Sequence, residues 1–374
     1  MESKKNDIES KKKKSEKKLD SKQDKKTKKE KKSKKENLES SLDSNIESNN
    51  KIGVLLLNMG GPTDIYSVES FLKNLFADPL ILQIKNGFIR KMVASMIVNK
   101  RLEISKENYR KIGGGSPIIK HTFALTEVLN KLDSTKFYSY TMRYTPPNAY
   151  STLQECKQKG INDLVLFSMY PQYSTTTTLS SFNDIYNNLK QLDYKPRVST
   201  IAHYYLDLDF YKLILDSIYK TLGDKESKDF TLLLSAHSLP QSIIDKGDPY
   251  LEHCQKGLEI IKDLTKDRPF KDVILCFQSK IGKQKWLEPS TTKVLADLAK
   301  KGESNVVVYP LAFSIDNSET DFELKIEYKE LADKLGFKNY LVSPCLNDSE
   351  DFARFIINKV NEKLRSINWS FYIV

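Results

Sequence analysis

A histidine follows an apolar segment in the middle of the chain, where its side chain could accept protons or bind a metal ion. The segment Phe230-Thr-Leu-Leu-Leu234 reads as a buried strand, and Ser235-Ala-His-Ser-Leu-Pro240 comes directly after it. In an open parallel sheet, ligands bind at the carboxyl ends of the strands. An imidazole with an ordinary pKa near ~6.5 can accept protons at neutral pH. Position alone leaves two readings of His237 about equally open, a structural histidine or a functional base.

A second strand end offers carboxylates. An apolar segment, residues 305–309, leads into Pro310-Leu-Ala-Phe-Ser-Ile-Asp-Asn-Ser-Glu319 and a predicted helix over 318–335. Asp316 lies just before that helix, and Glu319, Glu323 and Glu327 follow within it at a spacing of four. Their spacing places the three glutamates on one face, which taken alone favours a solvated acidic surface. Next to an imidazole, however, such oxygen ligands suit Fe(II), Co(II), Ni(II) or Zn(II), so we predict one shared pocket.

Strands and helices alternate along most of the chain, and this alternation must position both strand ends. It predicts an α/β fold with parallel sheets that carry helices on both faces. We count two such units, which meet near residue 180. The predicted divisions are a lysine-rich tail (1–50), an N-terminal domain (51–180), a C-terminal domain (181–345) and a final helix (346–374).

The tail accounts for most of the positive charge. Residues 1–50 contain 17 lysines against 11 acidic residues, which is +6 of the total +11. A segment with so few apolar residues cannot bury enough surface to fold, so we predict disorder. A solubilising extension is favoured over an arm that binds nucleic acid or lipid, and we predict no nucleic-acid partner.

Targeting signals are not evident in the sequence. The tail has no apolar h-region and no arginine, and no segment reaches the ~18 apolar residues of a spanning helix. The four cysteines are scattered, which is typical of reduced thiols. We therefore predict a cytoplasmic protein. The apolar segment 88–98 reads either as a lip over a pocket or as a patch that contacts a membrane peripherally.

Glycine-rich loops do not match the nucleotide-binding patterns. Met59-Gly-Gly-Pro62 lacks the G-x-G-x-x-G spacing of a dinucleotide site, and no Lys-Ser/Thr pair follows Gly113-Gly-Gly115. We expect the first loop to turn sharply and to approach a flat ligand closely. The hydroxyl-rich loop Tyr170–Thr178 could bind a carboxylate or phosphate, or cap the next helix.

Together these motifs resemble the ferrochelatase family. The matching segments, in chain order, are Asn58–Pro62, Tyr109–Pro117, Tyr170–Thr178, Ser235–Pro240, Asp245–Tyr250, Gln278–Gly282 with Trp286–Pro289, and Pro310–Glu319. The resemblance runs from about Lys51 to the C-terminus. It implies two Rossmann-like domains with a porphyrin cleft between them, and the insertion of Fe(II) into protoporphyrin IX to give haem.

The resemblance also implies roles for individual residues. His237 would accept protons and bind the metal, with Glu319 as its partner, and Asp316 and Glu323 would continue an acidic path. The matched positions that line the macrocycle or hold its propionates are Met59, Tyr109, Ser116, Arg143, Tyr250, Trp286 and Phe313. A guanidinium such as that of Arg143 fits a carboxylate. The metal would be a substrate, so we expect no bound cofactor.

The chain departs from the family pattern in two places. Many relatives have histidine where this chain has Asn317, and an amide cannot relay a proton at neutral pH. Animal relatives end in a cysteine-rich extension that holds an iron–sulfur cluster, and we predict no cluster here.

Three alternative functions stay open. They are a chelatase for coproporphyrin or another metal, a non-catalytic haem or metal carrier, and a nucleotide-dependent oxidoreductase. The missing dinucleotide-binding motif disfavours the last.

Overall fold

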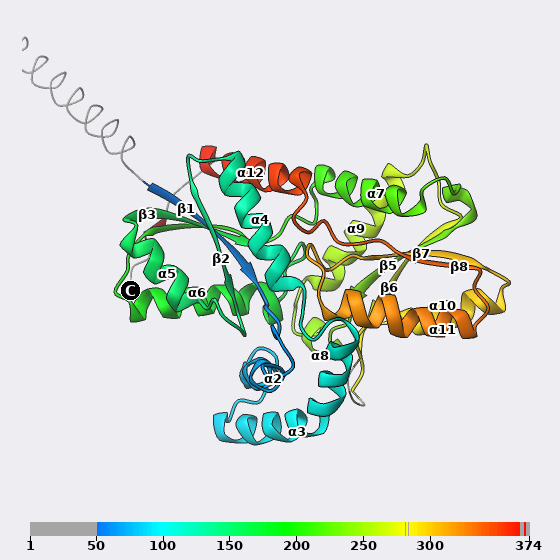
Figure 1. The fold of residues 1–374 in the computed structure, drawn as a ribbon, viewed down its shortest axis with the longest axis horizontal. Coiled ribbons are helices and arrows are strands. Elements are labelled where there is room, and N and C mark those ends of the chain that lie inside the picture. The colour runs from blue at the N-terminus through cyan, green and yellow to red at the C-terminus, as the bar shows by residue number, and fades with distance from the viewer. Residues whose placement is uncertain (1–50, 281, 283, 367–369, 372–374) are drawn as a thin grey trace, which may run out of the picture. The chain divides into compact units, whose positions relative to one another are not determined.

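Two β-sheets organise the chain (Figure 1). The computed structural model describes residues 51–366 except 281 and 283, together with the backbone of residues 370 and 371, so the predicted disordered tail lies outside the described residues. The first sheet has the order β2 (Phe137–Met142), β1 (Lys51–Asn58), β3 (Ile161–Ser168), β4 (Arg197–Ile201) and β9 (Ser370–Phe371). The second has the order β6 (Asp272–Gln278), β5 (Thr231–His237), β7 (Asn305–Pro310) and β8 (Asn339–Val342).

Helices connect the strands and cover both sheets. The helices of the first half are α2 (Val68–Ala77), α3 (Gly87–Lys111), α4 (Ile118–Leu132), α5 (Ala149–Gln158), the π-helix η1 (Thr175–Leu179) and α6 (Ser180–Gln191). Those of the second half are α7 (Leu208–Leu222), the 3₁₀-helix η2 (Ser227–Asp229), α8 (Gln241–Ile244), α9 (Tyr250–Leu264), α10 (Thr291–Lys300), the π-helix η3 (Glu319–Glu327), α11 (Tyr328–Lys334) and α12 (Glu350–Arg365). The predicted helix 318–335 is thus a π-helix followed by an α-helix.

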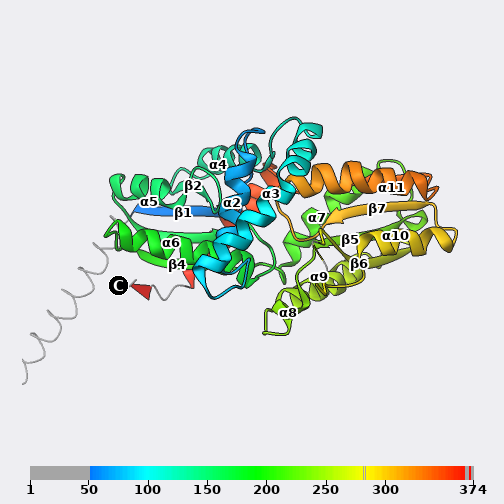
Figure 2. The same ribbon diagram turned by 90° about the horizontal axis from the view of Figure 1, so that it is seen from below.

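Successive residues of a strand pack on opposite faces of its sheet. In β1, Val54 and Leu56 join the core that lies under α4, whereas Leu55 and Leu57 join the core under α5 and α6. In the second sheet, Leu232 and Leu234 face α7 and α9, and Leu233 faces α10 and α11. Helices therefore cover both faces of each sheet (Figures 1 and 2), and the predicted pair of helix-flanked parallel sheets is confirmed.

The order of the strands creates a topological switch point in each sheet. From β1 the chain first adds β2 on one side and then β3 on the other, and from β5 it adds β6 and then β7 in the same way. Crossovers on opposite faces leave a crevice at the carboxyl ends of the two central strands, which is where open α/β sheets bind ligands. In the second sheet those ends belong to β5 and β7, the two strands that lead to His237 and Glu319.

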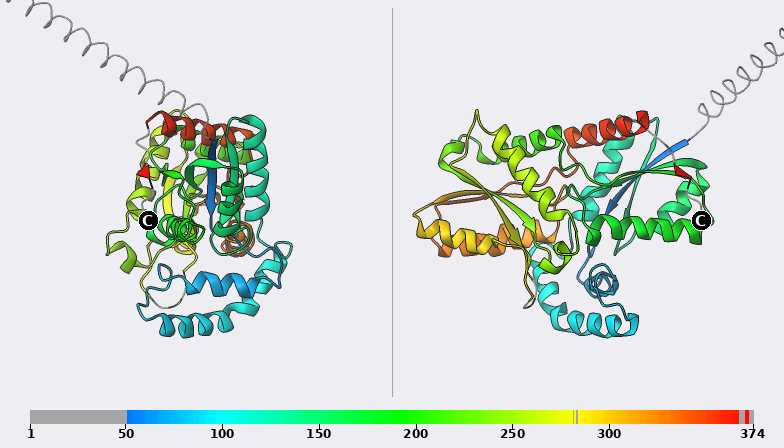
Figure 3. Two further views of the ribbon diagram at one scale, coloured as in Figure 1. Left: turned by 90° about the vertical axis from the view of Figure 1, so that its left-hand side faces the viewer. Right: turned by 180° about the vertical axis from the view of Figure 1, so that it is seen from behind.

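The first sheet extends beyond the predicted domain boundary at residue 180. Strand β4 lies after that position but pairs in parallel with β3, and Arg197 forms a two-point ion pair with the buried Asp163 at 2.6 and 2.7 Å. Helix α12 packs against both α4 and α7 and lies beside strand β4 of the first sheet (Figures 1 and 3). The division at residue 180 therefore cuts through one sheet, because α6 and β4 return to the strands before them.

Helix α3 carries the predicted apolar segment 88–98 beside α2 (Figure 2). Ala94 and Val98 are buried against α2, but Phe88, Met92 and Met96 are 80%, 51% and 65% exposed. These three residues are spaced by four and share one helix face. No helix among the described residues combines the length and the apolar character needed to cross a bilayer.

Two glycine-rich loops, residues 59–62 and 113–115, pack closely against neighbouring chain segments at the end of β1. A Cβ on Gly60, which has a φ of +82°, would lie 2.2 Å from Oγ1 of Thr145, and a Cβ on Gly61 would lie 2.6 Å from Cβ of Ser116. Gly115 approaches the backbone of Thr63 in the same way. The sharp turn that the sequence predicts is therefore present, and these glycines also allow close contacts between chain segments.

Candidate functional site

The ends of β5 and β7 bring His237 and Glu319 into contact. His237 is the last residue of β5 and lies opposite Gln278, the last residue of β6. Glu319 begins the π-helix η3 after β7, and its Oε2 lies 2.9 Å from Nδ1 of His237. The two side chains are one-third and one-fifth exposed, so the pair is open to a ligand on one side. The predicted juxtaposition of imidazole and carboxylate is therefore present in the structure.

Gln278 and Ser279 hold the same carboxylate from the end of β6. Oε2 of Glu319 accepts hydrogen bonds from Nε2 of Gln278 at 3.2 Å and from Oγ of Ser279 at 2.8 Å. Gln278 is fixed in turn, because its Oε1 accepts a 2.6 Å hydrogen bond from the buried hydroxyl of Ser235. Three donors from two neighbouring strands thus converge on one oxygen atom.

Glu323 lies one turn further along the π-helix and shares Ser279 with Glu319. Its Oε1 accepts from the backbone N–H of Ser279 at 2.8 Å and from the hydroxyl of Tyr328 at 2.6 Å, and its Oε2 contacts the Ser279 hydroxyl. Arg101 of α3 supplies a positive charge nearby. π-Helices are rare and often mark functional sites. Here the carboxylates on successive turns of the π-helix both contact Ser279.

Charges in this cluster shift the protonation of its members in opposite directions. Burial favours the neutral form of His237, but the charge and hydrogen bond of Glu319 outweigh burial and raise the pKa of the imidazole. Burial likewise favours neutral Glu319, but His237 holds the pKa of this carboxyl below its ordinary value. The pKa of Glu323 is raised, because burial and the charge of Glu319 act together. The site therefore combines an imidazole and a second carboxyl group, Glu323, that both have a raised affinity for protons.

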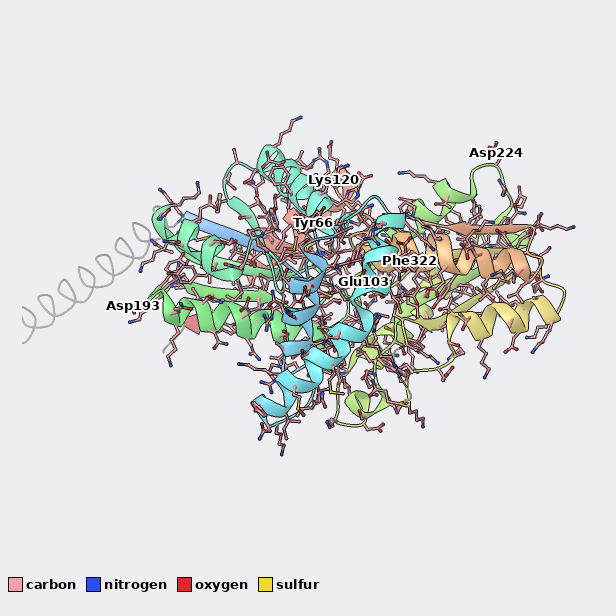
Figure 4. The ribbon with its side chains drawn as sticks, turned by 60° about the horizontal axis from the view of Figure 1, so that its bottom comes forward. Tyr66, Glu103, Lys120, Asp193, Asp224 and Phe322 are labelled. Atoms are coloured by element: carbon pink, nitrogen blue, oxygen red, sulfur yellow. The ribbon has the colours of Figure 1, made fainter. Side chains whose placement is uncertain are left out.

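Two of the predicted porphyrin-binding residues support this cluster directly. The hydroxyl of Tyr250 donates a 2.8 Å hydrogen bond to the backbone oxygen of His237. The hydroxyl of Tyr109 donates to Oγ of Ser318 at 3.3 Å, and burial raises the pKa of this phenol to about 12. Tyr109 lies near the end of α3, which passes beside the π-helix in the region where Figure 4 labels Glu103 and Phe322.

Asp316 belongs to a different buried network. Its Oδ2 accepts from Nδ2 of Asn347 at 2.8 Å, its Oδ1 accepts from the backbone N–H of Cys345 at 3.3 Å, and Lys325 lies 3.9 Å away. The structure therefore brings Glu319 and Glu323 together with His237, whereas it ties Asp316 to the loop before α12. The charge of Asp316 is matched locally by Lys325.

Arg143 is held by acidic residues of the first sheet's helices. Its Nη2 lies 2.9 Å from Oδ2 of the buried Asp78, its Nε donates to Oγ of Ser180 at 2.8 Å, and its Nη1 lies 3.8 Å from Asp184. Tyr144 also donates to Oδ2 of Asp78 at 2.9 Å. A guanidinium has five N–H donors, so the side chain keeps capacity for a further acceptor.

The remaining predicted porphyrin-binding residues lie on loops around the strand ends. Met59 packs against the cluster formed by α2 and α3, and Ser116 packs against Gly61. Phe313 packs on the large core beneath the second sheet. The backbone of Trp286 pairs with Pro240, three residues after His237.

The hydroxyl-rich loop after β3 forms a contact between the two halves. Oδ2 of Asp248 accepts hydrogen bonds from Oγ of Ser174 at 3.0 Å, and from the backbone N–H and hydroxyl of Thr175 at 2.7 and 2.6 Å. The backbone N–H of Tyr173 donates to Nδ1 of His253 at 3.1 Å. Both predicted uses occur within the protein. Asp248 is the bound carboxylate, and Ser174 caps the π-helix η1, because its Oγ accepts from the backbone N–H of Thr176 at 3.1 Å.

We expect His253 to make the stability of the protein fall in mild acid. Burial, and to a smaller extent His203, lower the pKa of His253 to about 4, whereas an unfolded histidine has a pKa near ~6.5. The unfolded chain therefore binds the proton first, and this contribution to stability is complete above pH ~6.5 and is lost as the pH falls toward about 4. In denaturant titrations, the free energy of unfolding should change less between pH 7 and pH 5 for His253→Asn than for the wild type. An equal change in the two proteins would contradict the assignment.

Several contributing residues were not assigned a role from the sequence. Gln278, Ser279 and Tyr328 bind the two glutamates, and Asp248 joins the halves. A signal was present for the first two, because Gln278 and Ser279 also follow a predicted strand and therefore share the ligand-binding edge with His237.

Comparisons with known proteins identify the family. A family model described as Ferrochelatase matches residues 51–364. Ferrochelatase of Helicobacter pylori is 53% identical over 83% of this chain and 93% of its own length, and that of Wolinella succinogenes is 48% identical over 83% and 98%.

Structural similarity agrees at the level of the fold. The structure of SirB from Bacillus subtilis with Fe3+ superposes with a TM-score of 0.52 at 14% identity, and covers 83% of this chain and 95% of its own. The sequence matches are far stronger than this likeness, and the family model covers residues 51–364. The chain therefore belongs to the ferrochelatase family, whose members insert ferrous iron into a porphyrin during haem synthesis.

Proposed function

We propose that this enzyme inserts Fe(II) into protoporphyrin IX, with the macrocycle bound between the carboxyl ends of the two sheets. The contact between His237 and Glu319 at the switch point of the second sheet is the observation that carries this proposal. The pair combines a base with an oxygen ligand, which suits both pyrrole deprotonation and a ferrous ion. The sequence resemblance supports protoporphyrin IX as the porphyrin.

In the proposed reaction, two pyrrole N–H bonds break as iron–nitrogen bonds form, and two protons leave. His237 accepts a pyrrole proton, and Glu319 stabilises the imidazolium because its carboxylate lies 2.9 Å from Nδ1. Glu323 accepts protons next, since burial and the charge of Glu319 raise its pKa. The role of Asp316 in the same path is less direct, because its oxygens face Asn347 and Cys345.

We further propose that the protein distorts the porphyrin ring so that the nitrogen lone pairs become accessible to the metal. Binding of the apolar macrocycle and of its propionates would provide the free energy for this distortion. Arg143 is the proposed propionate partner. It would bind the propionate while it remains anchored to Asp78, which fixes the orientation of the guanidinium.

Asn317 takes a structural role in this scheme. Its Oδ1 accepts a 2.8 Å hydrogen bond from the backbone N–H of Glu319. The backbone N–H of Asn317 donates to Oγ1 of Thr320 at 2.9 Å. The side chain therefore fixes the first turn of the π-helix and needs no change of protonation to do so.

An anaerobic assay with Fe(II) and protoporphyrin IX, followed by absorbance, tests the function. Repeated turnover by substoichiometric enzyme supports iron insertion. Turnover only with coproporphyrin would replace the proposed substrate, and binding without turnover of either porphyrin would indicate a carrier. A parallel series with Co(II) and Zn(II) would define the range of metals.

The exposed face of α3 supports the proposed peripheral contact with a membrane. Phe88, Met92 and Met96 present apolar surface to solvent, with the exposed Lys91 beside them to attract anionic lipid. We expect Phe88→Ser/Met92→Ser/Met96→Ser to lower co-sedimentation with anionic vesicles several-fold, against a Leu206→Ser/Leu208→Ser control. Equal binding of both variants to the vesicles would contradict the contact.

The cytoplasmic location stays a prediction, which cell fractionation would test.

A further inference from the structure

We propose that Ser279 is a positioning residue for the reaction, and that its hydroxyl and backbone N–H hold the carboxylates of Glu319 and Glu323 in register with His237. This role rests on the proposed function, because it concerns the same cluster. It adds a third component to the site that neither binds substrate nor belongs to the acidic row.

The backbone of Ser279 adopts a conformation that non-glycine residues rarely use. Its φ is +67°, in the left-handed region, immediately after the last residue of β6. A strand that ended in extended conformation would alternate its side chains across the sheet. The left-handed turn instead directs both the N–H and the hydroxyl of Ser279 to Glu323, at 2.8 Å for the N–H. Outliers of this kind persist where the surrounding structure requires them.

The Ser279 hydroxyl lies between two carboxylates that would otherwise repel each other. Its Oγ is 2.8 Å from Oε2 of Glu319 and also contacts Oε2 of Glu323. Like-charged carboxylates in a partly buried site avoid each other unless polar groups lie between them. Removing this hydroxyl would therefore free both side chains to rotate apart, and Glu319 would leave Nδ1 of His237.

The scaffold beneath Ser279 is rigid, so the serine can act as a fixed reference point. Gln278 is buried, and its Oε1 binds Oγ of Ser235, which in turn lies 2.8 Å from Oγ1 of Thr291. Strand β6 is also paired with β5 along its full length, so that Gln278 lies opposite His237. Gln278 contacts only Glu319 of the two acids, whereas Ser279 contacts both.

Paired substitutions separate the hydroxyl from the backbone conformation. Ser279→Gly removes the hydroxyl, keeps the N–H and adopts the left-handed conformation without strain, and Ser279→Ala removes the hydroxyl but retains the strain. We expect both variants to lower kcat for iron insertion by roughly 10- to 100-fold and to raise the KM for iron. The KM for porphyrin should stay within about twofold of wild type.

Asp193→Gly is the matched control. Asp193 is exposed and also has a positive φ of 42°. Figure 4 labels it at the left-hand edge of the view, well apart from Phe322 of the π-helix. This variant should retain wild-type kinetics, so that any general effect of placing glycine at a left-handed position is measured separately.

A crystal structure of Ser279→Gly gives a readout that does not depend on activity. We expect Glu319 to leave its 2.9 Å contact with His237 and Glu323 to adopt another rotamer. Three results for Ser279→Gly would each overturn the proposal. The first is that both carboxylates keep their wild-type positions, and the second is that the kinetics are those of the wild type. The third is that KM rises equally for iron and porphyrin while the unfolding temperature falls. If wild-type enzyme fails to insert metal, the proposed function fails, and the rotamers alone then decide the role of Ser279.

Discussion

Replacing His237 by alanine is expected to lower kcat for iron insertion by roughly 10²- to 10⁴-fold, the range typical of a lost general base. Porphyrin binding should persist, because the imidazole contributes little of the apolar surface that a macrocycle would contact. The measurement is anaerobic turnover by absorbance, with porphyrin binding followed separately by fluorescence quenching.

His121→Ala provides the matched control for this experiment. Nδ1 of His121 lies 2.7 Å from Oδ1 of Asp348, so the chain contains a second pair of a histidine and a carboxylate with nearly the same geometry. This pair joins α4 to the loop before α12 and lies outside the cluster around Glu319. Wild-type turnover of the control, together with loss in His237→Ala, would assign the effect to the site. Turnover of His237→Ala within about tenfold of wild type would refute the role of His237 as base.

The second large effect is expected for Glu319→Gln, which should lower kcat by roughly 10²-fold or more. The amide keeps the shape of the side chain but loses its charge, so it neither stabilises an imidazolium nor attracts a ferrous ion. It also brings an N–H₂ group to a position where His237, Gln278 and Ser279 now direct their polar atoms.

Glu323→Gln gives the comparison that makes this prediction specific. Glu323 lies one turn further along the π-helix, whereas Glu319 is the acid that contacts Nδ1 of His237. We therefore expect a loss several-fold smaller than for Glu319→Gln. Because both acids contact Ser279, the double variant should show a non-additive loss. An equal effect of the two single substitutions would argue against an order of action along the π-helix.

Much of the fold could be predicted from the sequence, because parallel sheets leave simple patterns. Segments such as Phe230–Leu234 are apolar without alternation, since both faces of the strand are buried, and helical segments of regular length separate them. The order of the strands was not predictable in this way. Strand β4 looks like the first strand of a second domain, yet it pairs with β3 through backbone groups that every residue possesses.

The candidate site was predictable in part for the same reason. His237 and Glu319 each follow an apolar strand, and the carboxyl ends of neighbouring parallel strands share one edge, so their contact follows from the pattern once the strands are adjacent. Asp316 shows the limit of this reasoning. The family resemblance implied a place for it in the same path, but the turn before the π-helix directs its carboxylate to Asn347.

Local apolar patterns and motif order were enough to predict the two helix-flanked sheets, the strand ends that carry chemistry, and the residue types of an iron-inserting site. They did not reveal which groups hold the glutamates, why glycine is required at Gly60 and Gly61, or which partners Arg143 and Asp248 have. Those features depend on contacts between segments far apart in the chain, and the geometry of such contacts is set by packing rather than by neighbouring residues.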